Sequence, residues 1–295
     1  MKNACINRRI FLKSSLMAAA GVAALQQFPY HLFAGESKKF AHDIVALGKT
    51  GIKVSRLAMG TGSGGYNKHS KQTRLLGVQG VADLFEEAFD YGVMFWDTAD
   101  QYGSHPHIRE ALKRVPREKV VILTKTHAST AKEMESDLDR FRKEIGSDYI
   151  DIILLHNMTN PNWPRLKKGA MDFLSQAREH GLIRAHGVSC HTIGALRAAA
   201  ATDWVQVDLA RINPYGLYMD GAVPDVLQVL NQMKRQGKGV IGMKIIGAGK
   251  LTTKIDESLQ YVMGQSSVDC FSIGMTSTYQ FNDIVRRIPA ASVRG

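Results

Sequence analysis

Eight short apolar runs alternate with amphipathic helical windows from about residue 45 onward, and this alternation constrains the fold more than any other feature. The runs are rich in β-branched residues and apolar almost throughout, as expected for parallel strands buried on both faces. The expected strands are 56–59, 93–96, 120–124, 150–155, 185–188, 205–210, 240–243 and 270–273. Eight regular β-then-α units predict an α/β fold of the (β/α)8 TIM-barrel type.

Two further patterns support this architecture. Val81, Leu84, Phe85, Ala88 and Phe89 recur at helical spacing and form one apolar stripe, as a helix packed on a sheet requires. Ahead of the first unit, two β-rich segments at 44–47 and 52–55 flank a Gly-Lys-Thr-Gly turn and predict an N-terminal β-hairpin that closes the bottom of the barrel. No linker or repeat divides the chain, so residues 35–295 are expected to form one domain.

Composition excludes several classes of protein. The 295 residues are 44% hydrophobic and 22% charged, which is ordinary for a globular protein with one large core. The formal charge of +11 comes from Lys and Arg residues scattered among acids, without a basic stripe interleaved with aromatics, so we expect no nucleic-acid partner. Cys5, Cys190 and Cys270 show no metal-binding spacing and imply no disulfide framework.

The first 34 residues differ from the rest in holding four basic residues and no acid. The stretch from Arg8 to Lys13 (RRIFLK) resembles a twin-arginine signal peptide, and the apolar run at 16–25 is too short to cross a bilayer. We therefore expect a leader at 1–34 that engages export machinery, a periplasmic or otherwise exported protein, and no stable membrane span. A Sec-type signal and an uncleaved anchor stay open as alternatives.

A glycine-rich motif after the first expected strand matches the dinucleotide fingerprint GxGxxG at 60–65. A Rossmann site requires a helix that opens at once, whereas the next six residues are polar and carry no apolar stripe. The glycines are better explained as a loop that approaches cofactor or substrate.

Polar residues stand where three consecutive strands are expected to end, which is where barrel enzymes place their reactive groups. Asp97 ends the second strand, Tyr102 follows in its loop, Lys125 ends the third strand and His156 ends the fourth. An ammonium beside a phenol helps the phenol to give up its proton, an acid can hold that ammonium, and an imidazole can position a carbonyl oxygen. Singly, each residue has a structural explanation; together, they predict proton transfer.

The segments around these residues resemble the aldo-keto reductases, in order and at family spacing, over residues 45–289. They are DTADQYG at 97–103, ILTK at 122–125, LLH at 154–156, GLIRAHGVS at 181–189 and VIGMKIIGAGKL at 240–251. The resemblance implies a reductase that converts an aldehyde, ketone or sugar carbonyl to an alcohol with NADPH or NADH. It makes Asp97, Tyr102, Lys125 and His156 the catalytic tetrad.

The resemblance also implies a cofactor site across the barrel mouth. Its expected residues are Gly60, Thr61, Ser189, Cys190, Met243, Lys244, Gly247, Gly249, Lys250, Leu251, Gly274, Thr276 and Gln280. Several depart from the family pattern. Cys190 and Leu209 replace amide-binding side chains, Met243 replaces a stacking aromatic, and Gly274 and Gln280 replace two phosphate-binding cations. Either NADH is accepted, or other cations such as Lys250 or Arg286 hold the 2′-phosphate.

For the substrate we expect contacts from Tyr66, from an exposed Trp163 and from Arg211, which could attract an anionic group. A metal-dependent barrel enzyme would need several converging carboxylates and histidines, and Asp97 stands nearly alone, so no metal is expected. A barrel that binds cofactor as a sensing or binding module and turns over weakly is the remaining alternative. The sequence carries no signal for the oligomeric state.

Overall fold

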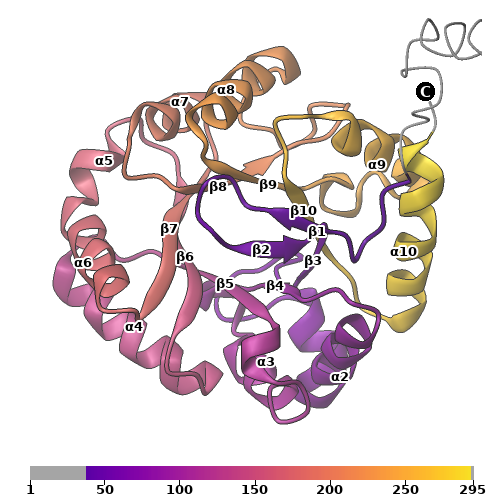
Figure 1. Cartoon of the computed structure of the whole chain (residues 1–295), viewed down its shortest axis with the longest axis horizontal. Coiled ribbons are helices and arrows are strands. Elements are labelled where there is room, and N and C mark those ends of the chain that lie inside the picture. The colour runs from indigo at the N-terminus through magenta and orange to yellow at the C-terminus, as the bar shows by residue number, and fades with distance from the viewer. Residues whose placement is uncertain (1–37, 294–295) are drawn as a thin grey trace, which may run out of the picture. The chain divides into compact units, whose positions relative to one another are not determined.

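The computed structural model describes residues 38–293, and in them eight parallel strands close into a barrel surrounded by helices (Figure 1). The barrel strands are β3 (Leu57–Gly60), β4 (Phe95–Asp97), β5 (Val121–Thr126), β6 (Ile150–Met158), β7 (Ile183–Cys190), β8 (Val207–Arg211), β9 (Gly239–Met243) and β10 (Cys270–Gly274). Their order around the barrel is β10-β3-β4-β5-β6-β7-β8-β9, so each strand pairs with its neighbour in sequence and β10 closes on β3. The predicted TIM barrel is confirmed, and each of the eight strands overlaps its predicted range.

The helices follow the strands in the expected alternation. They are α2 (Lys71–Asp90), α3 (His105–Ala111), α4 (Ala131–Ile145), α5 (Trp163–Leu166), α6 (Lys168–Glu179), α7 (Ile193–Ala201), α8 (Val223–Gln236), α9 (Ile255–Gly264) and α10 (Thr278–Ser292), with 3-10 turns η2 (Asp100–Tyr102), η3 (Arg117–Lys119), η4 (Gly247–Gly249) and η5 (Thr252–Lys254). Local chemistry sets some boundaries. In α4 a Thr130–Glu133 capping box starts the helix and Gly146 ends it in the left-handed conformation.

The strands are apolar throughout because the core has two parts. Phe95, Leu123 and Ile152 belong to a cluster that fills the barrel, while Trp96 and Ile122 from the same strands belong to a second cluster that packs against the helices. Alternate side chains of a strand point to opposite faces, so both faces of each strand are buried.

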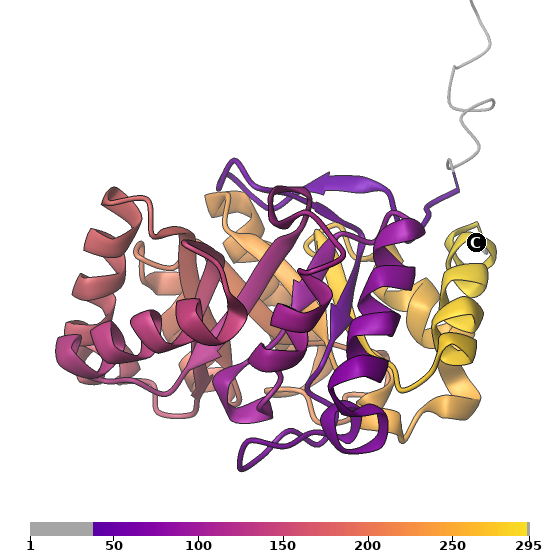
Figure 2. The same ribbon diagram turned by 90° about the horizontal axis from the view of Figure 1, so that it is seen from below.

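The N-terminal hairpin closes one end of the barrel, as predicted. β1 (Ile44–Ala46) and β2 (Lys53–Ser55) pair antiparallel, and Leu47, Ile52 and Val54 enter the cluster that fills the barrel. The hairpin crosses one end of the barrel, and the loop after β3 projects from the opposite end (Figure 2). That opposite end, where the strands finish, is the open one.

An acid side chain, Asp208 in β8, is completely buried in the core. No nitrogen or oxygen donor of residues 38–293 reaches either of its carboxyl oxygens, and the thiol of Cys190 lies close to it. Burial raises the pKa of Asp208 well above the ordinary value, and nearby Asp220 adds to the effect. Burial therefore favours the neutral form of Asp208 in the folded protein.

Two expectations from the sequence concern export and the membrane. The predicted signal peptide at 1–34 lies outside the described residues. Within residues 38–293, no helix has both the length and the apolar character needed to cross a membrane.

Asp208→Asn should stabilise the fold, and increasingly so as pH rises. A folded-state pKa raised above the unfolded value of about 4 means that ionisation favours unfolding as soon as pH exceeds the unfolded pKa. The neutral amide avoids this cost, so we expect a gain of about 1–2 kcal/mol at pH 8, or roughly 2–8 °C in Tm, that shrinks toward pH 4. Thermal unfolding at several pH values measures it. The matched control is Asp172→Asn, because Asp172 is an exposed partner of Lys168; a gain for Asp208→Asn that does not vary with pH would contradict the explanation.

Candidate functional site

Three neighbouring strands deliver polar side chains to the open end of the barrel. Asp97 is the last residue of β4, Lys125 lies near the end of β5 and His156 near the end of β6. The parallel registers place these strands side by side, and Tyr102 reaches the same place from η2, five residues after Asp97. The structure therefore brings the four residues singled out by sequence into one site.

A buried ion pair lies at the base of this site. The ammonium of Lys125, which is 1% exposed, is 2.5 Å from a carboxylate oxygen of Asp97 and donates to the carbonyl of Thr98 at 2.7 Å. The other oxygen of Asp97 accepts a 2.7 Å hydrogen bond from Ser272 on β10. Burial opposes the charge on Lys125, but Asp97 and the Tyr102 phenol outweigh it and raise its pKa, so the ammonium stays charged.

The Tyr102 phenol lies beside this ammonium. The Lys125 nitrogen is 4.9 Å from the centre of the Tyr102 ring, and the phenol oxygen is 3.5 Å from Nε2 of His156. Burial raises the pKa of Tyr102 and the Lys125 charge opposes that rise. At neutral pH the phenol is therefore protonated, with a positive charge in place to stabilise the phenolate once the proton leaves.

His156 is held neutral. Burial, followed by the positive charge of Lys125, lowers its pKa to about 2. Its ring stacks on His127, with ring centres 4.9 Å apart, and His127 bonds Gln101 at 2.6 Å. Sequence reasoning missed His127, although it stands two residues after Lys125 and directly after β5, where the same strand-end rule could have found it.

The Tyr102 ring packs against two glycines in the loop after β3. A Cβ added at Gly62 would lie 2.4 Å from the ring, and one at Gly65 would lie 2.2 Å from it. Neither glycine has a positive φ, so the backbone conformation does not require glycine at these positions. The absence of a side chain leaves room for the Tyr102 ring. The glycine-rich motif thus admits the tyrosine of the site, and no helix follows until Lys71, which agrees with the rejection of a Rossmann site.

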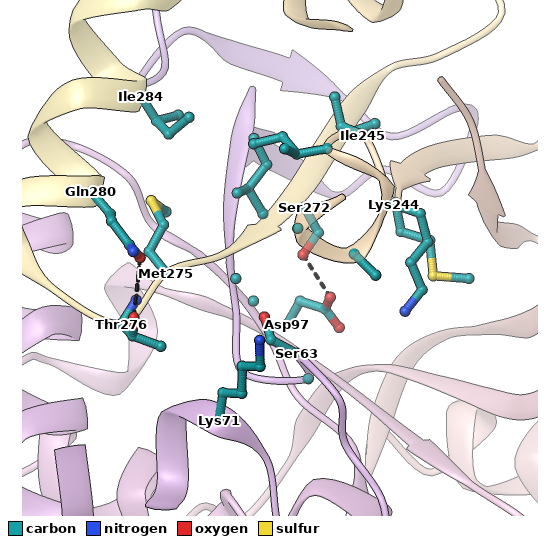
Figure 3. Close-up of a pocket in the computed structure, with 18 of the residues that line it drawn as sticks. Ser63, Lys71, Asp97, Lys244, Ile245, Ser272, Met275, Thr276, Gln280 and Ile284 are labelled. Carbon is teal, nitrogen blue, oxygen red and sulfur yellow. Dashed lines mark hydrogen bonds between the residues drawn. The ribbon is translucent and has the colours of Figure 1, made fainter. Parts of the chain in front are cut away.

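A pocket of about 450 Å³ extends from Asp97 and Tyr102 toward α10 (Figure 3). Seven residues of the predicted cofactor set line it: Gly60, Met243, Lys244, Gly249, Gly274, Thr276 and Gln280. The pocket walls also include side chains that the sequence did not indicate, among them Ser63, Lys71, Ile245, Ser272 and Ile284. At the end far from Asp97, the Gln280 side chain accepts from the backbone of Thr276 at 2.8 Å.

The other predicted cofactor residues do not line this pocket: Thr61, Ser189, Cys190, Gly247, Lys250 and Leu251. Thr61 instead bonds the carbonyl of Asp97 and the hydroxyl of Ser104. Ser189 is buried at the end of β7 and accepts from the backbone of Asn157 at 3.0 Å. Cys190 is fully buried as well.

The pocket residues are compatible with an anionic ligand such as a dinucleotide. Ligand pockets of this kind span roughly 300–1,000 Å³, and two lysines, Lys71 and Lys244, line its walls. At Gly274 a Cβ would lie 2.4 Å from the Ser63 hydroxyl, so a larger residue there would narrow the pocket between β10 and the loop after β3.

Of the three predicted substrate residues, one is placed differently from the expectation. Trp163 was expected to be exposed, but it is 1% exposed, because the first turn of α5 packs against α7 and its indole donates to the carbonyl of Ala195. Tyr66 is 67% exposed in the loop after β3. Arg211 ends β8 and pairs with the buried carboxylate of Asp220.

One close group of metal-ligand side chains lies beside the site in the described part of the chain: Asp100, His105 and Glu144. These groups already satisfy one another. Arg140 binds both carboxylates, and His105 bonds Glu144 at 2.7 Å and Thr124 at 2.8 Å. We interpret the group as an ion-pair network that braces η2 and α3.

Curated relatives of this chain include a reductase and a dehydrogenase. A curated relative, versiconal hemiacetal acetate reductase of Aspergillus parasiticus, is 30% identical over 175 residues, so the chain spans about half the length of that relative (48% of this chain, 49% of the relative). L-Galactose dehydrogenase of Arabidopsis thaliana is 24% identical over 230 residues, which cover 71% of this chain and 67% of the relative.

Solved structures share the fold. A crystal structure from Pseudomonas aeruginosa described as an aldo-keto reductase superposes with a TM-score of 0.71 at 22% identity, covering 86% of this chain and 97% of that one. The model of the Aldo/keto reductase family matches residues 56–290, which is most of the chain. This chain belongs to the aldo/keto reductase family of oxidoreductases.

Proposed function

We propose that this protein reduces the carbonyl of an aldehyde, ketone or sugar to an alcohol with NADPH or NADH, and that Tyr102 is the proton donor. The observation that carries the proposal is the position of the Tyr102 phenol in the pocket, beside the buried ion pair of Lys125 and 3.5 Å from Nε2 of His156. General acid catalysis needs a proton that is held close to the reacting oxygen and can leave with low cost.

The geometry supports a specific arrangement for the substrate. The Tyr102 oxygen and His156 Nε2 are 3.5 Å apart, so one carbonyl oxygen can approach both. In the tautomer with its proton on Nε2, neutral His156 donates to that oxygen, and Tyr102 donates from the other side. Both donors favour the oxygen as negative charge develops on it.

The chemistry that NADPH or NADH supplies is hydride transfer to the carbonyl carbon. The carbonyl oxygen takes its proton from Tyr102, and the Lys125 ammonium stabilises the phenolate that remains. Asp97 keeps Lys125 charged and fixed in place, supported by Ser272. The roles of Asp97 and Ser272 are therefore to position a charge rather than to touch the substrate.

The pocket lining supports a distribution of cofactor contacts. Met243 would face the nicotinamide, and Gly249, Gly274, Thr276 and Gln280 would hold the rest of the dinucleotide. The two cations considered from sequence for the 2′-phosphate do not line the pocket, and Arg286 is bonded to Asp283. Of the two lysines that line the pocket, we assign Lys71 to that phosphate if NADPH is the cofactor.

A second candidate is a barrel that binds the cofactor as a sensing or binding module and turns over weakly. Three observations favour it: Cys190 is fully buried, Leu209 packs inside the barrel and Met243 lines the pocket. Cys190 and Leu209 do not offer the polar contacts that an amide side chain would make with the nicotinamide amide, and Met243 does not offer the stacking surface of an aromatic ring. We also propose export of the protein through its predicted leader; this proposal rests on the sequence alone.

Tyr102→Phe tests the proposed proton donor. The ring stays and only the hydroxyl is lost, so we expect kcat to fall about a hundredfold or more, while the affinity for NADPH or NADH changes by less than about threefold. Steady-state kinetics and fluorescence titration of the same preparation measure the two effects. Turnover within a few fold of the unmodified protein would remove Tyr102 from its role.

Gly65→Ala tests whether the loop after β3 positions the phenol. The added Cβ would force the Tyr102 ring to move, and a displacement on the order of 1 Å can reduce turnover by about a hundredfold. We expect kcat to fall at least about tenfold with little change in Tm, since the loop is at the surface. Gly264→Ala is the matched control, because a Cβ there meets nothing within 4 Å. Unchanged kcat for Gly65→Ala would show that the ring does not need this space.

Separate titrations with NADPH and NADH, followed by fluorescence, test the cofactor binding that both candidate functions require and decide between the cofactors. Micromolar binding of at least one is expected. A preference for NADPH of about tenfold or more that disappears in Lys71→Met would assign the 2′-phosphate to Lys71, and equal binding would indicate that NADH is accepted. If neither binds, the reductase proposal fails and a barrel without a nicotinamide cofactor remains.

A further inference from the structure

Basic residues follow the ends of five successive strands on one side of the barrel mouth. Lys125 and His127 belong to the end of β5, His156 to β6, His191 directly follows β7, Arg211 ends β8 and Lys244 directly follows β9. The acids that face them are few. Asp97 pairs with Lys125 and Asp220 pairs with Arg211, which leaves the charge of Lys244 unbalanced.

Lys244 has unusual features. Its ammonium makes no hydrogen bond or ion pair with any residue in the range 38–293, although the side chain is partly buried and lines the pocket. Its backbone is left-handed, with φ of 58°, which is costly for a residue with a long side chain. A partly buried cation without a partner is costly as well, so a ligand that supplies a negative charge would stabilise this arrangement.

Lys244 lines the same pocket as Asp97 and Tyr102, and its charge interacts with groups of the site. Burial, Arg211 and Lys125 lower the pKa of Lys244, and Asp97 opposes them. Lys244 in turn contributes to the lowered pKa values of His156, about 2, and His191, about 4, for both of which burial is the largest cause. In Figure 3, Lys244 lies on one side of Asp97, and Thr276 and Gln280 lie on the other.

We propose that Lys244 recognises a carboxylate on the carbonyl substrate, so that the enzyme acts on oxo acids or aldehydes that carry an acid group. The proposal rests on the proposed reductase function and specifies its substrate class. The carbonyl lies at Tyr102 and His156, and the carboxylate lies at Lys244, within the same pocket. Arg211, although paired with Asp220, adds to the positive potential there and favours the same charge.

A phosphate of the cofactor is the alternative partner for Lys244. The charges that act on its ammonium include Lys125 and Asp97, the ion pair beside Tyr102, and none of them belongs to the end of the pocket near Gln280. A partner beside Tyr102, the substrate, is therefore favoured over a phosphate near Gln280. The two partners separate experimentally, because one changes substrate discrimination and the other changes cofactor affinity.

A matched pair of aldehydes tests the proposal: 4-carboxybenzaldehyde and its neutral methyl ester, methyl 4-formylbenzoate. The unmodified protein should prefer the acid. Lys244→Met should lower kcat/KM for the acid by about tenfold or more and change kcat/KM for the ester by less than about threefold. Lys168→Met is the control, because it removes one positive charge from an exposed pair on α6. Equal effects of Lys244→Met on both aldehydes would overturn the proposal, as would a weakening of NADPH or NADH binding that leaves the preference for the acid intact.

Binding of benzoate and benzamide, measured by calorimetry, separates this proposal from the reductase function. If neither aldehyde is reduced, the reductase proposal fails, but the anion site is still tested. Benzoate that binds better than benzamide, and loses at least about tenfold in affinity in Lys244→Met but not in Lys168→Met, supports the site. Absence of benzoate binding, or equal binding by the unmodified protein and Lys244→Met, overturns it.

Discussion

The buried ion pair between Lys125 and Asp97 is the interaction on which the site depends. The partners come from neighbouring strands, β5 and β4, and Ser272 adds a hydrogen bond from β10 on the other side. Removing one partner of such a pair leaves a buried charge and typically costs about 3–5 kcal/mol. Barrel closure brings these three strand ends together. The closed barrel tolerates the two buried charges because each has a partner of opposite charge.

Burial is the largest influence on the pKa values of both His156 and Tyr102, and the positive charge of Lys125 acts on the two in opposite senses. It adds to burial in keeping His156 neutral, and it opposes burial at Tyr102 by favouring the phenolate. The result is two groups that can each donate to one oxygen at neutral pH, with the charge needed by the phenolate already present. Under the proposed reductase function, both donors are already in place before the substrate reacts, as expected of a preorganised site.

The sequence predicted most of the fold and the four central residues for a physical reason. Strands buried on both faces give apolar runs, and polar residues at the ends of such runs are conspicuous, so Asp97, Lys125 and His156 could be found by position. Trp163 could not be placed correctly, because its burial depends on packing between α5 and α7, and a tryptophan among polar residues gives no local sign of that contact. The same limit applies to Gly65, whose partner Tyr102 is distant in sequence.

The pocket walls were the least predictable part, and the backbone explains why. Lys244 and Ala248 both have positive φ, a conformation that neither residue type favours and that no periodic pattern signals. In the chain after β9 these turns direct Lys244 toward the pocket while Lys250, six residues later, does not line it. Family spacing locates the segment correctly but cannot say which of its cations faces the ligand. The folded backbone decides which lysine faces the pocket. It places Lys244 there, with an ammonium that has no partner among residues 38–293.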